Sequence, residues 1–187
     1  SDNIPAEYQV INDPQYDDTP LSDEMIAEIK KMQKDFTQEV PYYYSSGALN
    51  LMHKMKGKFS PHIGDLAAEL GIVLPLVGVV KGSKDKFELG RSSAVWMLTN
   101  VSYGKESLAK LLGKERFISL LGLLLQTKSE DIKGYTMVLL GNTVKNDNTL
   151  RNAIIKADLL RPIPKLCLHH SASLELIRQT VFFMLNF

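Results

Sequence analysis

The chain has 187 residues, of which 44% are hydrophobic, so it can bury a core, and its length allows one domain or two. Its 22 basic residues balance 21 acidic ones, which excludes a strong overall attraction to nucleic acid or to anionic membranes. The single cysteine, Cys167, excludes an internal disulfide framework. The sequence has no apolar run of about eighteen residues and opens without a secretion signal, so we expect the protein in the cytoplasm or nucleus.

The predicted elements start after an acidic tail. Residues 1–20 are polar and are broken by Pro5, Pro14 and Pro20, which predicts a disordered segment. Apolar residues at helical spacing then predict a helix that follows Ser22, its expected N-cap. From there to the last residue the patterns are helical and are separated by short turns, with no convincing alternating strand. The sequence therefore predicts an all-α protein.

An internal repeat organises most of the chain. Three apolar segments end on an asparagine: "AVWMLTN" at Asn100, "TMVLLGN" at Asn142 and "TVFFMLN" at Asn186, with spacings of 42 and 44 residues. The helical segments that precede them keep the same period. A period of about 40 to 47 residues built from a short helix and two longer ones is typical of armadillo or HEAT repeats. One such unit cannot bury its apolar face alone, so stacked units share a core.

This period predicts a right-handed α-solenoid of armadillo repeats. We expect residues 21–187 to form one domain, with about three full repeats near residues 47–100, 101–142 and 143–187 after an N-terminal cap or partial repeat. The last repeat ends on an apolar residue without a polar capping helix. We therefore expect that the native protein continues beyond it, or that this end packs on another chain.

Two stretches resemble the importin-α family of armadillo adaptors. The family's third-helix motif is similar to "SSAVWMLTNVSYG", and its next repeat is similar to "MVLLGNTVKNDNTLRNAIIKADLL"; the resemblance covers about residues 48–187. It implies a non-enzymatic adaptor for nuclear import, without cofactor or metal. It implies as partners an extended peptide with a basic nuclear localisation signal, bound in the concave groove, and other transport factors.

The resemblance also implies the binding residues. In the family each third helix presents a tryptophan and, four residues later, an asparagine on the same helix face. The asparagine bonds the peptide backbone, and tryptophan walls hold lysine side chains through cation–π contacts worth about 0.5 to 2 kcal/mol. Carried over to this chain, the implied peptide-binding residues are Trp96, Asn100, Gly104, Asn142, Asn146, Phe182 and Asn186.

The sequence departs from the family at several of these positions. Val138 stands where the second tryptophan is expected and Phe182 where the third is expected. Asn146, beside Lys145, replaces the acid that pairs with the key lysine, and only Asp147 lies close enough to substitute. The acidic residues 1–20 also lack the family's basic importin-β-binding segment. An alternative is therefore an armadillo scaffold that has lost basic-peptide binding and mediates other protein contacts or self-association.

Several assignments stay open at this point. Trp96 either faces the groove or fills the core, and the three asparagines either bind a ligand or stabilise neighbouring helices. The tyrosine run at residues 42–44 is either a helix-end plug or a partner surface. A third hypothesis, a chaperone-associated armadillo factor, is neither supported nor excluded. The stretch "CLHHS" lacks a second ligand pair for zinc, and no nucleophile and base set is present, so we expect neither a metal site nor an enzyme.

Overall fold

The computed structural model describes residues 15–36, 41–82, 88–145, 147–168 and 172–187, and leaves out the side chains of residues 41–45, 88 and 167. The described part of the chain folds into helices that follow one another in sequence. Their bounds are α1 (Asp23–Phe36), α2 (Pro41–Lys54), α3 (Pro61–Glu69), α4 (Val73–Gly82), α5 (Glu88–Tyr103), α6 (Leu108–Leu112), α7 (Lys114–Leu125), α8 (Glu130–Val144), α9 (Asn148–Lys156), α10 (Ile163–Leu168) and α11 (Leu174–Asn186).

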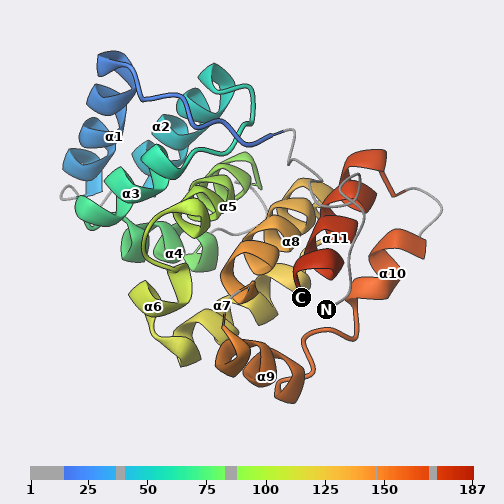
Figure 1. The fold of residues 1–187 in the computed structure, drawn as a ribbon. Helices are drawn as coiled ribbons and strands as arrows, with labels where there is room; N and C mark the ends of the chain where they lie inside the picture. Colours follow the sequence, from blue (N-terminus) through green and yellow to red (C-terminus); the bar gives the residue numbers. More distant parts are fainter. Residues whose placement is uncertain (1–14, 37–40, 83–87, 146, 169–171) are drawn as a thin grey trace.

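The longer helices form a row. Helices α2, α5, α8 and α11 lie side by side, each in contact with the next (Figure 1). The shorter helices pack behind them: α3 and α4 against α5, α7 against α8, and α10 against α11. The described part of the chain thus builds three triplets, α3–α5, α6–α8 and α9–α11, after an opening pair α1–α2. This arrangement confirms the predicted stack of three repeats behind an N-terminal partial unit.

The layer boundaries differ from the predicted ones. Residue 47 lies inside α2, and residues 100 and 142 lie inside α5 and α8, which continue to Tyr103 and Val144. The turn at residues 55–60 separates the opening pair from the first triplet. The prediction placed each boundary at an asparagine, but these asparagines lie in the last turn of a helix and not after its end.

Polar side chains fix where the helices begin. Ser22 accepts a hydrogen bond from the backbone N–H of Met25, as predicted for a cap of α1. The same contact recurs at the start of four later helices, from residues Ser107, Ser129, Asp147 and Ser173. Each such cap stabilises its helix by about 1 kcal/mol, since it satisfies a backbone donor that the helix leaves free.

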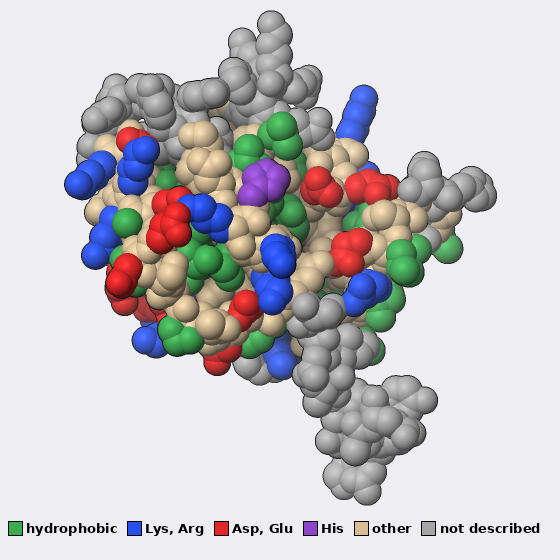
Figure 2. Space-filling model, turned by 90° about the horizontal axis from the view of Figure 1, so that it is seen from above, with side chains coloured by type: hydrophobic (Ala, Val, Ile, Leu, Met, Phe, Trp, Pro, Cys, Tyr) green, Lys and Arg blue, Asp and Glu red, His purple; other side chains and the backbone are tan. Residues whose placement is uncertain are grey.

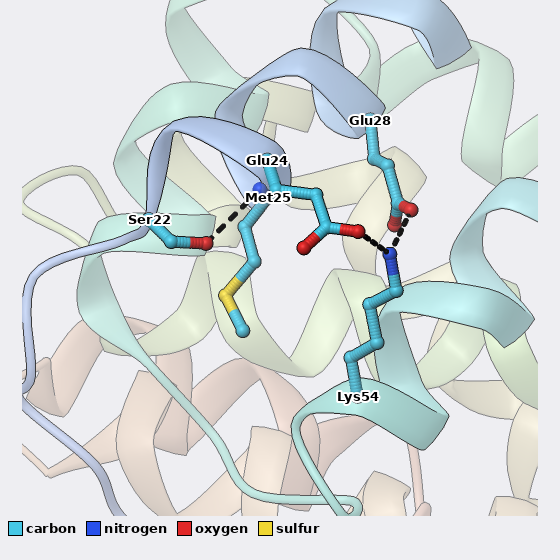
Figure 3. A network of polar contacts seen from close by, with 5 residues as sticks. All are labelled: Ser22, Glu24, Met25, Glu28 and Lys54. Carbon is cyan, nitrogen blue, oxygen red and sulfur yellow. Dashed lines mark hydrogen bonds and ion pairs between the residues drawn. The ribbon is translucent and has the colours of Figure 1, made fainter.

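An ion-pair network joins α1 to α2 (Figure 3). The ammonium group of Lys54 lies 2.7 Å from Glu24 and also bonds Glu28. The hydrogen bond from Lys54 lowers the pKa of the Glu24 carboxyl, and the two carboxylates raise the pKa of Lys54. The network holds the last turn of α2 against the first turns of α1.

One apolar core runs through all the layers. It extends from Ile29 in α1 to Phe183 in α11 and includes the fully buried rings of Phe59, Trp96 and Phe117. Helix α11 in addition leaves apolar side chains exposed: Leu174, Val181, Met184 and Leu185. Because the core is continuous, no triplet buries its apolar face on its own.

Close helix contacts require small residues. A Cβ atom on Gly64 of α3 would overlap the backbone carbonyl of Asn100 in α5. One on Gly134 of α8 would overlap the side-chain amide of Gln179 in α11. Gly64 therefore sets the spacing between α3 and α5, whereas the neighbour of Gly134 is the end of a side chain.

Part of the predicted tail is ordered against the fold. Tyr16 forms an isolated parallel β-bridge with Phe59: the N–H of Asp17 donates to the carbonyl of Phe59 at 2.7 Å, and the N–H of Phe59 donates to the carbonyl of Gln15 at 2.6 Å. We call residues 15–20 the N-terminal segment; residues 1–14 lie outside the described residues. The prediction of disorder was therefore wrong for residues 15–20, because composition does not reveal pairing to a distant turn.

Among the described residues, no single helix is long and apolar enough to cross a membrane. Helices α3 and α4 reach that length only together, and they are bent by 97° relative to each other.

Candidate functional site

Trp96 lies in the core. Its side chain is 0% exposed, and its ring nitrogen donates a hydrogen bond to the carbonyl of Gly57 at 3.4 Å. The turn after α2 thus contacts the indole, which leaves no ring face open to a peptide lysine. The groove-facing role implied for Trp96 is corrected to core packing.

Asn100 is also fully buried and serves the fold. Its side-chain carbonyl accepts a hydrogen bond from the N–H of Ser60 at 2.6 Å, and its amide nitrogen donates to the carbonyl of Trp96 at 2.9 Å. Ser60 is the residue before the first turn of α3. Asn100 therefore fixes the start of α3, and in this structure both ends of its amide are engaged within the chain.

Asn142 and Asn186 remain partly exposed. The amide of Asn142 donates to the hydroxyl of Ser102 in α5 at 3.2 Å. The amide of Asn186 donates to the carbonyl of Phe182 at 2.8 Å, the same contact that Asn100 makes with Trp96. These two asparagines keep part of their surface available, and a ligand role for them stays a prediction.

The other implied residues occupy different environments. Val138 is 2% exposed and belongs to the core, and the ring of Phe182 packs over Gly141 of α8. Gly104 lies in the turn after α5, where a side chain would overlap the carboxylate of Asp65. Asn146 lies outside the described residues, as do the side chains of residues 42–44 and the stretch 169–171.

The N-terminal segment crosses helices that are distant in sequence. The ring of Tyr16 lies 5.3 Å from that of Tyr103 in α5, and Tyr103 stacks on Phe59 at 5.5 Å. Polar contacts hold the following residues: Asp17 forms an ion pair with Lys58 at 3.4 Å, and the carboxylate of Asp18 lies 3.2 Å from the ring nitrogen Nε2 of His62. The hydrogen bonds of Thr19, and then the contact with Lys58, hold the pKa of Asp17 below its usual value. This surface holds an extended chain through backbone bonds, an aromatic contact and polar side-chain contacts.

Beside this segment lies a cleft of about 250 Å³, which we call the acidic cleft. It is formed by the turn after α2, the N-terminal segment and the first two turns of α8 and α11. The lining residues are Gln15, Lys56, Gly57, Glu130, Asp131, Tyr135, Ser173, Glu175, Leu176 and Gln179. Figure 2, which looks down on the molecule from above, shows acidic side chains on the right, on the side of α11, and others on the left. The lining therefore contains three carboxylates, of Glu130, Asp131 and Glu175, and one lysine, Lys56.

The partly buried phenol of Tyr135 responds to the charge of the cleft. Burial raises the pKa of Tyr135 to about 12, and the negative charges of Asp131 and Glu175 add to the shift. Its hydroxyl contacts the sulfur of Met52 at 3.6 Å, a weak acceptor. The cleft is therefore rich in hydrogen-bond acceptors and in negative charge.

The sequence contains a signal for this cleft that the motif analysis missed. Two pairs of lining residues lie 44 residues apart, Asp131 with Glu175 and Tyr135 with Gln179. They occupy equivalent positions of consecutive repeats, so the repeat period places them on neighbouring helices. Reading every position of the repeat, and not only tryptophan and asparagine, would have found them. Among the described residues, no group of three or more His, Cys, Asp and Glu side chains is arranged to hold a metal ion.

No protein-family model and no curated protein matches this sequence. Solved structures do match. A computationally designed armadillo repeat protein for modular peptide recognition is similar with a TM-score of 0.60 and 21% identity, over 87% of this chain and 63% of that chain. The designed protein YIII(Dq)4CqI gives a TM-score of 0.62 with 20% identity and the same coverage. The designed protein YIII(Dq.V1)4CPAF, in complex with the peptide (KR)4, gives 0.60 with 22% identity over 87% and 64%.

The chain has the armadillo-repeat fold. It is an α-solenoid, as the repeat period predicted. The chain spans less than two thirds of the length of the designed armadillo proteins that it matches. At identities of 20 to 22% the likeness shows the fold alone, and it does not single out importin-α among armadillo proteins.

Proposed function

We propose that this protein is an armadillo scaffold that binds an extended segment of a partner protein. The observation that carries the proposal is the pairing of the N-terminal segment with Phe59, in which two backbone hydrogen bonds of 2.6 and 2.7 Å hold an extended chain. Main-chain bonds give affinity for any extended peptide, and side-chain contacts add specificity. A partner segment would take the place of residues 15–20.

Two observations support this class of function. Designed armadillo proteins of the same fold were made for peptide recognition, and one of them holds a peptide. In this chain, Tyr103, Lys58 and His62 already bind the aromatic and acidic side chains of the N-terminal segment. The surface thus has contacts ready for a peptide.

A second candidate is the importin-α-like adaptor that carries a basic nuclear localisation peptide between cytoplasm and nucleus, together with other transport factors. The asparagine repeat and the (KR)4 peptide of a protein with the same fold support it. The full burial of Trp96 and Asn100 favours the scaffold instead, since neither residue offers a surface to a lysine side chain.

Competition between the N-terminal segment and a free peptide tests the proposal. A labelled peptide of sequence DPQYDDTP, which repeats residues 13–20, is titrated into the full chain and into its Tyr16→Ala variant. We expect tighter binding to the variant, because the loss of the Tyr16–Tyr103 contact weakens the resident segment. Lys58→Glu should weaken binding of the free peptide to the Tyr16→Ala variant, while Lys105→Glu serves as the matched control.

If the peptide binds neither chain, the scaffold proposal is wrong. A lysine-rich peptide in the same titration decides between the candidates: binding that survives the loss of Lys58 and competes with the labelled peptide supports the adaptor.

A further inference from the structure

The acidic cleft has more acceptors than donors. Glu130 accepts a hydrogen bond from the backbone N–H of Ser173 at 3.4 Å, and Glu175 lies 3.5 Å from Arg178. Asp131 is exposed at the start of α8. Lys56 is the cation in the lining, so three carboxylates outnumber it. A ligand that brings positive charge and several N–H donors would balance the cleft.

A buried amide adds a second, independent observation. Gln179 lines the cleft and is only 8% exposed, yet its side chain has no hydrogen bond in the described structure. Its side-chain oxygen is held against Gly134 of α8. The amide atoms themselves are open to the cleft and are not buried without a partner, so a ligand group in the cleft can bond them.

The N-terminal segment shows how a ligand reaches this cleft. The side-chain amide of Gln15 donates a hydrogen bond to Glu175 inside the cleft. The next residue, Tyr16, forms the bridge to Phe59 and directs its ring to Tyr103. Successive side chains of an extended chain point to opposite sides. The path therefore fixes a register, with one donor in the cleft and an aromatic residue after it.

We propose that the acidic cleft is a receptor for a guanidinium group, and that the partner segment carries an arginine followed directly by an aromatic residue. The guanidinium is planar and always charged, and it has five N–H donors in a fixed fork that matches carboxylates. When the arginine takes the position of Gln15, its guanidinium reaches Glu175. Asp131 and the side-chain oxygen of Gln179 line the same cleft. This proposal rests on the scaffold function and names its specificity.

A substitution in the chain itself tests the receptor without any partner. Gln15→Arg places a guanidinium at the mouth of the cleft, and we expect the thermal midpoint to rise by about 2 to 4 °C. Glu175→Gln should abolish that rise. Glu106→Gln, which changes an exposed carboxylate paired with Lys110, should leave it intact, and Gln15→Leu controls for the loss of the amide. Absence of a rise, or a rise that persists with Glu175→Gln, overturns the proposal.

Peptides test the register in trans. The labelled peptide DPRYDDTP is titrated into the Tyr16→Ala chain, beside the same peptide with citrulline for arginine and the peptide DPRADDTP. We expect each change to weaken binding by about tenfold, since citrulline has the shape of arginine without its charge. Equal affinity of the arginine and citrulline peptides overturns the proposal.

Free agmatine, which carries the same guanidinium, distinguishes a peptide from a small cation as the source of the group. Agmatine that binds as tightly as DPRYDDTP overturns the peptide assignment and leaves a small-molecule site. The two proposals can fail independently. If no peptide binds but Gln15→Arg stabilises the chain through Glu175, the cleft is a guanidinium receptor and the proposed binding of a partner segment is wrong.

Discussion

The side-chain oxygen of Asn100 in α5 lies 2.6 Å from the backbone nitrogen of Ser60, the N-cap of α3, so the bond joins the first and last helices of the first triplet. Both groups are fully buried, so the bond is protected from water. A residue that the sequence placed in a ligand groove thus holds the start of α3 against α5 within the first triplet.

Substitution of Asn100 tests this structural role. Asn100→Ala leaves the N–H of Ser60 buried without an acceptor, and we expect a loss of about 1 to 3 kcal/mol in the free energy of unfolding. Urea denaturation followed by circular dichroism measures it. Asn186→Ala is the matched control, because that amide is partly exposed and bonds only within its own helix. Equal losses for the two variants would contradict the role of Asn100.

Trp96 provides a second test. Trp96→Ala removes a large side chain from a fully buried site, and we expect a loss of about 3 to 5 kcal/mol. Trp96→Phe should cost less, since it keeps most of the volume. Emission of the wild-type chain, which has a single tryptophan, should lie at the short wavelengths of a buried indole. An emission maximum typical of water-exposed tryptophan would show that the ring faces the groove after all.

The pKa of Tyr135 predicts a response to alkali. Its pKa is raised to about 12 in the folded chain from an ordinary value of 10.0, so the fold favours the neutral phenol. This contribution to stability is fully present below pH 10 and is lost as the pH rises toward 12. Absorbance at the tyrosinate band should show a late transition that is missing in Tyr135→Phe. A titration of the two proteins that differs only near pH 10 would refute the burial of this phenol.

The pKa of Glu24 predicts a response to acid. Because Lys54 lowers the pKa of Glu24, the ion pair stabilises the fold above the usual carboxyl value of 4.5, and the effect is lost as the pH falls through the lowered pKa. Between neutral pH and pH 3 the thermal midpoint of Glu24→Gln should therefore fall less than that of the wild type. The difference should be small, since exposed ion pairs contribute little, and it should shrink further in high salt. Parallel curves would mean that the pair does not form in solution.

The fold was predictable from the sequence because the repeat period is a property of the whole chain. Asn100, Asn142 and Asn186 mark corresponding turns of α5, α8 and α11, and their spacing alone gave the number of layers. Ser22 was predictable as a cap for a similar reason, since the contact is local.

The exposure of single side chains could not be predicted in this way. Whether Trp96 faces a groove depends on the turn at Gly57, which is distant in sequence and has no motif. The place of Tyr16 depends on Tyr103 and Phe59 in the same manner. The acidic cleft combines residues of four separated regions, and only the spacing of its paired residues pointed to it.

The contact of Gln15 with Glu175 joins residues 160 positions apart, from the segment before α1 to the first turn of α11. The N-terminal segment also forms backbone hydrogen bonds with Phe59 and contacts Tyr103. It therefore contacts the turn after α2, the middle helix α5 and the last helix α11. An α-solenoid can bend and extend along its axis, because each repeat contacts only its neighbours. A link between the segment before the first helix and the last helix limits this extension. A partner that displaces the N-terminal segment would therefore let the solenoid lengthen. Small-angle scattering would record the longer molecule as an increase in its radius of gyration.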